Sequence, residues 1–186
     1  MQRILLVGIS LLLICGRELA RPADLDLTQR YLLLATTKTS TMQKELDRAS
    51  SAGYRIVGSS PTGGSEMVAI LEKISTPPRT YQYFLLATSR TSTMQKELNE
   101  AAERGFRLMP KTIIAKEQVL GGVEIVSLME KAPNSSQHYR YLLLATSRTS
   151  TMQKELAQAA EDGYEIIGMV SRGEHIVILE KPAPAQ

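Results

Sequence analysis

A short cluster of hydroxyl side chains beside one basic side chain occurs three times in this sequence. Each cluster stands at the start of a segment with helical spacing, where free backbone N–H groups and the positive end of the helix dipole favour an anion. We therefore expect an anionic ligand at each cluster, and helix capping alone is the alternative. The clusters are Lys38-Thr39-Ser40-Thr41, Arg90-Thr91-Ser92-Thr93 and Arg148-Thr149-Ser150-Thr151.

Catalytic and cofactor motifs are missing from the sequence. It contains no nucleophile elbow, no phosphate-loop lysine motif, no His-Glu-x-x-His helix and no clustered metal ligands. The histidines are His138, in an expected linker, and His175, at an expected strand start. We expect no cofactor and no metal site, and we favour a non-enzymatic protein. The alternative is a small hydrolase or ligand-converting enzyme with a site between repeats.

The three clusters belong to three copies of one sequence unit. Residues 31–46 align without gaps with residues 83–98 and 141–156, and the starts are 52 and 58 residues apart, which marks an internal repeat. The octapeptide Thr39-Ser-Thr-Met-Gln-Lys-Glu-Leu46 is identical in all copies, whereas the second halves have diverged. This identity has two open explanations, which are a shared function and recent duplication.

Each unit has the pattern of a strand, a helix and two further strands. The opening strand, 31–36 in the first copy, is apolar at almost every position, so we expect both of its faces to be covered, one by the helix of its unit and the other by another repeat or another chain. A right-handed crossover makes the first two strands parallel, and the third should lie between them, antiparallel to both. The prediction is an α+β fold of three tandem β-α-β-β repeats packed into one assembly, with a helix on one face of each small mixed sheet.

The boundaries of these units follow from the alignment. We place the repeats at 27–73, 80–131 and 138–181, and a disordered tail at 182–186. The second strands are expected at 54–57, 106–109 and 164–167, and the third strands at 67–71, 123–129 and 176–179. The loops between these strands vary, and we expect them, including the long 111–122 segment, to be surface hairpins.

Capping and core signals delimit the helix of each unit. Ser40 is expected to cap the first helix, with Gln43 completing a capping box, and Ser92/Gln95 and Ser150/Gln153 repeat the pair. Met42 and Leu46 begin an apolar stripe that we assign to the core rather than to a partner-binding surface. A glycine with a left-handed conformation should end each helix, at Gly53, Gly105 and Gly163.

The N-terminal segment has the composition of an export signal. Arg3 precedes the apolar run from Ile4 to Cys15, which Gly16 and charged residues end too early for a transmembrane span. We read residues 1–20 as a signal segment and expect a periplasmic or extracellular protein; a buried N-terminal element is the alternative. The stretch 12–16 resembles a bacterial lipoprotein signal, which would place a lipid anchor on Cys15.

The charge pattern restricts the class of partner. The formal net charge is +3, and we find no basic stripe interleaved with aromatic residues, so we do not expect nucleic acid as a partner. An anionic ligand or a protein partner remains. The sequence thus predicts an exported, non-enzymatic repeat protein that presents a triplicated surface for ligand or protein binding.

The second strand of each unit carries a family-like motif. Gly53-Tyr54-Arg55-Ile56-Val57 and Gly163-Tyr164-Glu165-Ile166-Ile167 follow the helices, and each unit closes on Glu-Lys. With the aromatic-led first strand, this pattern resembles a short bacterial β-α-β-β domain family of unknown function. The resemblance implies that fold and a bacterial origin, and it implies no activity.

Overall fold

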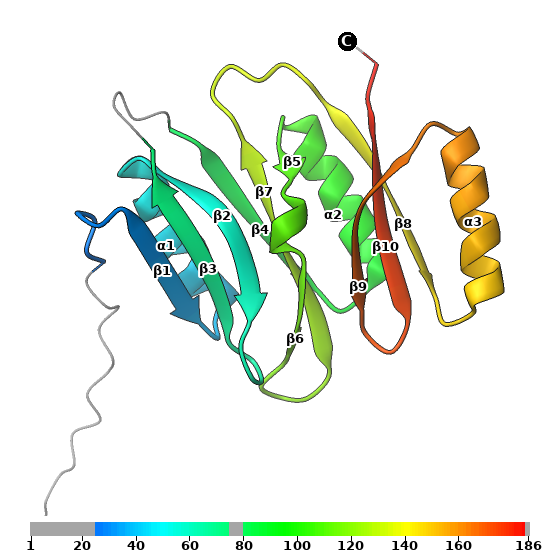
Figure 1. Cartoon of the computed structure of the whole chain (residues 1–186), viewed down its shortest axis with the longest axis horizontal. Coiled ribbons are helices and arrows are strands. Elements are labelled where there is room, and N and C mark those ends of the chain that lie inside the picture. The colour runs from blue at the N-terminus through cyan, green and yellow to red at the C-terminus, as the bar shows by residue number, and fades with distance from the viewer. Residues whose placement is uncertain (1–24, 75–79, 185–186) are drawn as a thin grey trace, which may run out of the picture.

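The computed structural model describes residues 25–74 and 80–184, so the expected signal segment 1–20 and Cys15 lie outside the described residues. The described chain forms three similar units that follow one another along the long axis of the molecule (Figure 1). In chain order the elements are β1 (Tyr31–Thr36), α1 (Thr39–Ser51), β2 (Tyr54–Pro61), β3 (Met67–Lys73), β4 (Gln82–Thr88), α2 (Thr91–Glu103), β5 (Arg107–Leu108), the 3-10 helix η1 (Pro110–Thr112), β6 (Ile114–Glu117), β7 (Val123–Lys131), β8 (Tyr139–Thr146), α3 (Thr149–Glu161), β9 (Glu165–Ser171) and β10 (His175–Pro182).

The predicted α+β class and strand order are confirmed in each unit. The sheets have the orders β1-β3-β2, β4-β7-β5 and β8-β10-β9, and β6 also pairs with β7. Every paired strand is antiparallel to the central one, so the sheets are antiparallel rather than mixed as expected. The last strands are longer than expected, because β3, β7 and β10 include the closing Glu-Lys pair. β10 reaches Pro182, and the Ala183 N–H donates to the His138 carbonyl at 2.9 Å.

The expected capping box at the start of each helix is wrong. Helix α1 begins at Thr39 with Lys38 as the N-cap, and no side chain of the described residues caps it. The Thr36 hydroxyl accepts the Lys38 N–H at 3.2 Å, so the turn before the helix is closed at Lys38, two residues ahead of Ser40. The same arrangement recurs with Thr88 and Arg90, and with Thr146 and Arg148.

The helix ends agree with the prediction. Gly53, Gly105 and Gly163 have φ angles of 86°, 87° and 80°, the left-handed conformation that lets the chain leave a helix sharply.

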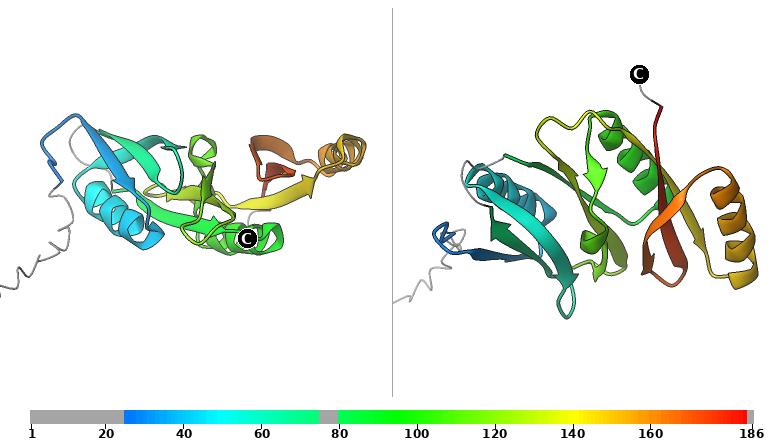
Figure 2. Two further views of the ribbon diagram at one scale, coloured as in Figure 1. Left: turned by 90° about the horizontal axis from the view of Figure 1, so that it is seen from below. Right: turned by 45° about the horizontal axis from the view of Figure 1, so that its top comes forward.

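Helices α1 and α2 share their hydrophobic cores with the following repeat. Leu46 on α1 and Leu98 on α2 are fully buried in clusters that contain side chains from the own unit and from the next one. The corresponding Leu156 on α3 is only half-buried, because its cluster draws on the third repeat alone. Figure 2 shows α1 and α2 on the same side of the strands, whereas α3 stands at the far end of the row.

The opening strands are covered unequally. The cover expected on both faces is absent in β1, where buried Leu32 and Leu34 alternate with exposed Tyr31 and Leu33. In β4 and β8 the equivalent residues are buried or half-buried, because the preceding helix packs against these strands. The both-face prediction was therefore wrong for the strand that no described helix precedes.

The long loop of the second repeat was expected to be a surface hairpin, and this is correct only for its tip: β6 and β7 form an antiparallel hairpin with an exposed turn, whereas Thr112, Ile114 and Lys116 are buried. It contains η1 and β6, which contact β2 of the first repeat and β9 of the third. Thr112 is fully buried, and the buried Lys116 pairs with Glu124 at 2.5 Å. In β2 and β9 the pairing with the central strand shifts by one residue at a β-bulge. The second repeat has its extra segment at the same position, between β5 and β6. We call η1 and β6 the wedge, because they lie between the first and third repeats.

Among the residues that the structure describes, no helix is both long and apolar enough to cross a membrane.

Candidate functional site: the cleft between the repeat junctions

A glutamine of the identical octapeptide joins each repeat to the next. The Gln43 amide donates to the Tyr83 carbonyl at 2.9 Å and accepts the Leu85 N–H at 2.8 Å, so it pairs with the free edge of β4 as a neighbouring strand would. At the second junction, Gln95 accepts the Leu143 N–H at 2.8 Å. Gln43 and Gln95 therefore bind the first strand of the next repeat, whereas the expected capping box would have placed their hydrogen bonds within their own helices.

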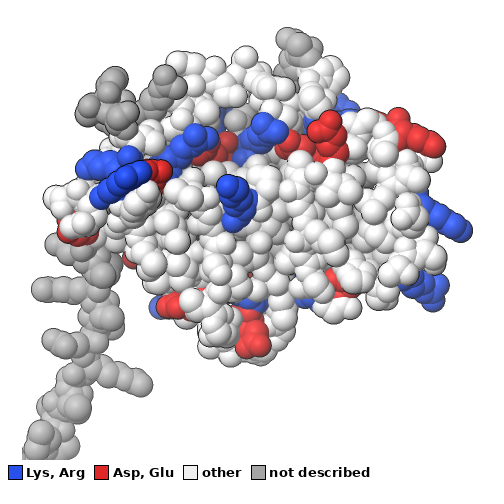
Figure 3. All heavy atoms as spheres, viewed as in Figure 1, with Lys and Arg blue, Asp and Glu red and all other residues white. Residues whose placement is uncertain are grey.

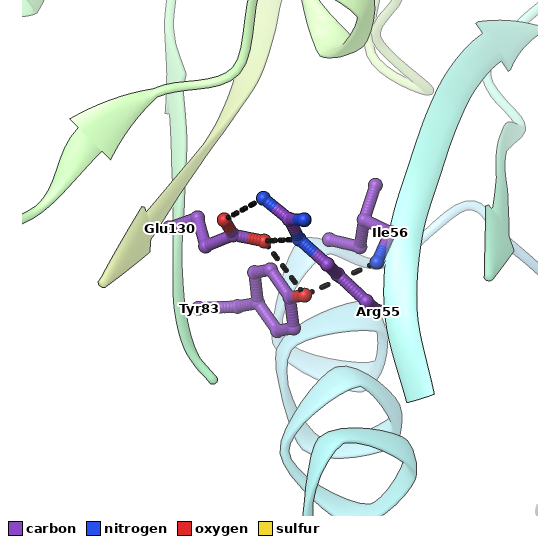
Figure 4. Close-up of polar contacts among 4 residues, drawn as sticks. All are labelled: Arg55, Ile56, Tyr83 and Glu130. Atoms are coloured by element: carbon purple, nitrogen blue, oxygen red, sulfur yellow. Dashed lines mark hydrogen bonds and ion pairs between the residues drawn. The ribbon is translucent and has the colours of Figure 1, made fainter. Parts of the chain in front are cut away.

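A buried carboxylate forms the second contact of the first junction (Figure 4). Glu130 on β7 accepts two hydrogen bonds from the Arg55 guanidinium on β2, at 2.8 and 3.0 Å, and one from the Tyr83 hydroxyl at 3.0 Å. Tyr83 also accepts the Ile56 N–H at 3.1 Å. The cluster therefore ties the second strand of one repeat to the first and last strands of the next.

The second junction repeats this cluster with equivalent residues. Arg107 on β5 donates to Glu180 on β10, with Nε at 3.2 Å from Oε1, and the Tyr141 hydroxyl accepts the Leu108 N–H at 2.8 Å. The register is the same, because Tyr83 faces Glu130 and Tyr141 faces Glu180.

The two clusters present their positive side to solvent. The Glu130 and Glu180 side chains are 9% and 8% exposed, whereas those of Arg55 and Arg107 are 47% and 55% exposed. Hydrogen bonding to the carboxylates raises the pKa of both guanidinium groups, which stay charged. Each guanidinium lies over a tyrosine ring, Tyr81 at 4.6 Å and Tyr139 at 4.2 Å, which fixes its plane.

Both arginines line one cleft of about 620 Å³ over the second repeat. Lys111, within η1, adds a third cation to its wall, and Ser135 and Gln137 supply polar groups. Figure 3 shows Lys and Arg side chains in a row, interrupted by Asp and Glu, across the upper half of the corresponding face. Because the carboxylates are buried beneath the guanidinium groups, the cleft can bind an anion through charge-assisted hydrogen bonds.

The structure does not bring the predicted anion clusters together. All three helices begin towards the lower edge of the view in Figure 1, at separate positions along it. Lys38, Arg90 and Arg148 are exposed there, as are Ser40, Ser92 and Ser150. Anion binding at Thr39, Thr41, Thr91, Thr93, Thr149 and Thr151 stays a prediction. Within residues 25–74 and 80–184, no group of three His, Cys, Asp or Glu side chains could hold a metal ion.

The junction residues were not predicted as functional from the sequence. The signal was present, because Arg55 and Arg107 both follow a Gly-aromatic pair and Glu130 and Glu180 both belong to closing Glu-Lys pairs. The pairing itself spans 75 and 73 residues, so no local pattern connects the partners.

Comparison of the chain with protein-family models, with curated proteins and with solved structures found no match.

Proposed function

We propose that the protein is a non-enzymatic binding protein whose central cleft holds an anionic ligand or an acidic segment of a partner protein. The observation that carries the proposal is that Arg55 and Arg107 are about half exposed on the wall of the cleft, whereas Glu130 and Glu180, which also line it, are largely buried. Lys111 extends the positive surface on the same wall. The proposed setting is the periplasm or the extracellular space, which rests on Arg3 and the apolar run after it.

The chemistry of the cleft favours binding over catalysis. Glu130 already accepts hydrogen bonds from Arg55 and Tyr83, so it is committed to the junction rather than available as a base. Burial raises the pKa of Tyr83, which keeps its hydroxyl protonated. The guanidinium groups retain free N–H donors on their exposed side, and these suit carboxylate or phosphate oxygens.

The experiment measures fluorescence anisotropy of a labelled hexa-aspartate peptide at low salt. Lys111→Gln should weaken the affinity by about threefold to tenfold, because it removes one cation from the cleft while leaving both junction clusters intact. Lys44→Gln is the matched control, since Lys44 is an exposed lysine on α1. The absence of saturable binding by the parent protein would refute the proposal.

A second variant separates the cleft from the helix starts. Replacing Lys38, Arg90 and Arg148 together by Gln removes more charge than Lys111→Gln does, yet it should leave the affinity nearly unchanged. Greater loss in the triple variant than in Lys111→Gln would assign binding to the helix starts and overturn the cleft proposal.

A further inference from the structure

The first repeat exposes one half of the junction seen twice inside the chain. Tyr31 and Leu33 on β1 are 54% and 61% exposed, whereas Tyr83 and Tyr141, which stand at the position of Tyr31 in the next two repeats, are 4% and 3% exposed. In β4 and β8 this edge is paired with an amide of the preceding helix. We call Tyr31, Leu33 and the backbone edge between them the start surface.

The third repeat exposes the other half. Ile166 on β9 is 60% exposed, whereas its equivalents Ile56 and Leu108 are 5% and 2% exposed inside the junctions. Gln153 on α3, the third copy of the docking glutamine, is also exposed. We call Gln153, Ile166 and the half-buried side of α3 the end surface.

We propose that the end surface of one copy binds the start surface of a second copy, so that the internal junction is repeated between molecules. The Gln153 amide then pairs with the Tyr31 carbonyl and the Leu33 N–H, as Gln43 pairs with β4. The Tyr31 hydroxyl accepts the Ile166 N–H, as Tyr83 accepts the Ile56 N–H. The occupant is a second copy because both surfaces are halves of an interface that this chain already forms twice.

The charged residues of the end surface and the start surface differ from those of the internal junctions, and the two differences match each other. Glu165 occupies the position of Arg55 and Arg107, so it cannot bind the closing glutamate of the next unit. At the start surface Glu72 is already paired with Arg30, at 2.9 Å, and Arg30 is largely exposed. In the proposed junction between two copies, the arginine is therefore Arg30 of the start surface. It can bind Glu165 of the end surface in addition to Glu72 of its own chain.

The proposed interface joins two different surfaces. Such a heterologous interface leaves one free half on each outer molecule, so association continues into a filament or closes into a ring. A face-to-face dimer uses the same surface twice and stops at two copies.

Sedimentation velocity of the parent protein and of two blocked variants tests the proposal. Leu33→Asp blocks the start surface and Ile166→Asp blocks the end surface, and each should weaken association by at least about tenfold. An equimolar mixture of the two variants should form a dimer and nothing larger, because each retains the surface that the other lacks. Leu120→Asp is the control, since Leu120 is a fully exposed apolar residue between β6 and β7, away from both surfaces.

Three results would overturn the proposal. The first is a parent protein that sediments as a monomer at millimolar concentration. The second is a mixture of the two variants that stays monomeric, which would exclude a heterologous interface. The third is association that Leu120→Asp weakens as strongly as Leu33→Asp does. Circular dichroism and the unfolding midpoint of each variant establish that it is folded, as expected for substitutions of exposed residues.

Discussion

Replacing the same glutamine by alanine in the first and third repeats should have very different effects on stability. Gln43→Ala removes two hydrogen bonds to the edge of β4, to Tyr83 and Leu85, whereas Gln153 is exposed and no further described unit follows it. A hydrogen bond of this kind contributes about 0.5–1.5 kcal/mol, and alanine regains roughly 0.3 kcal/mol of helix propensity. We expect Gln43→Ala to lower the free energy of unfolding by about 1–2 kcal/mol and Gln153→Ala by less than about 0.5 kcal/mol.

Urea unfolding followed by circular dichroism measures this difference. With a slope of about 2 kcal/mol per molar urea, Gln43→Ala should lower the midpoint by roughly 0.5–1 M. Both variants should be prepared in the Leu33→Asp background, so that docking of a second copy onto α3 does not stabilise the reference protein. The octapeptides are identical, but the Gln43 amide also donates to Asp47 at 2.8 Å, and the third copy has Ala157 at that position. Gln43→Ala is therefore measured in an Asp47→Ala background, in which the two sites have the same local sequence.

The comparison has a clear refuting outcome. If Gln153→Ala costs as much as Gln43→Ala, the glutamine acts within its own helix, and the assignment of Gln43 to the edge of β4 fails.

Three other measurements follow from the same structure. Burial raises the pKa of Tyr83 and Tyr141. The free energy of unfolding should therefore be unaffected by these tyrosines below pH ~10 and fall above it by about 1.4 kcal/mol per pH unit for each of them. The same fall with pH in the Tyr83→Phe/Tyr141→Phe variant would contradict this. Lys116→Met should lower the free energy of unfolding by about 3 kcal/mol in urea, because it leaves Glu124 without an ionic partner, and Lys116→Met/Glu124→Leu should recover most of this loss; no recovery would show that the ion pair is not the cause. Gly105→Ala should cost about 1 kcal/mol, because its φ is 87° and an added Cβ would lie 3.3 Å from Lys131; a neutral effect would argue against strain there.

The fold was predictable because each unit carries its own signals. The apolar strands, the helical stripe of Met42 and Leu46 and the left-handed Gly53 act locally, and three copies of the pattern support one another. The alternation of exposed and buried residues in β1 was not predictable, because nearly all of its side chains are apolar whether or not a helix covers them.

The candidate site was not predictable for a different reason. Arg55 and Glu130 are far apart in the sequence and belong to different repeats, so their pairing depends on how whole units pack. The role of Gln43 was misjudged because its spacing from Ser40 is that of a capping box, and the same amide satisfies a strand edge equally well. The burial of Thr112 and Lys116 likewise depends on the neighbouring strands β2 and β9.

The identical octapeptides of the helices have a consequence for how the chain folds. Since α1 and α2 present the same octapeptide to the following strand, pairing of the repeats in the wrong order is a specific hazard of this chain. The wedge formed by η1 and β6 counters it, because only the second repeat carries this segment and it contacts both β2 and β9. An error that brings the first and third repeats directly together leaves the wedge without its two partners. The wedge therefore favours the arrangement in which the second repeat lies between the first and the third, because only that arrangement buries it on both sides.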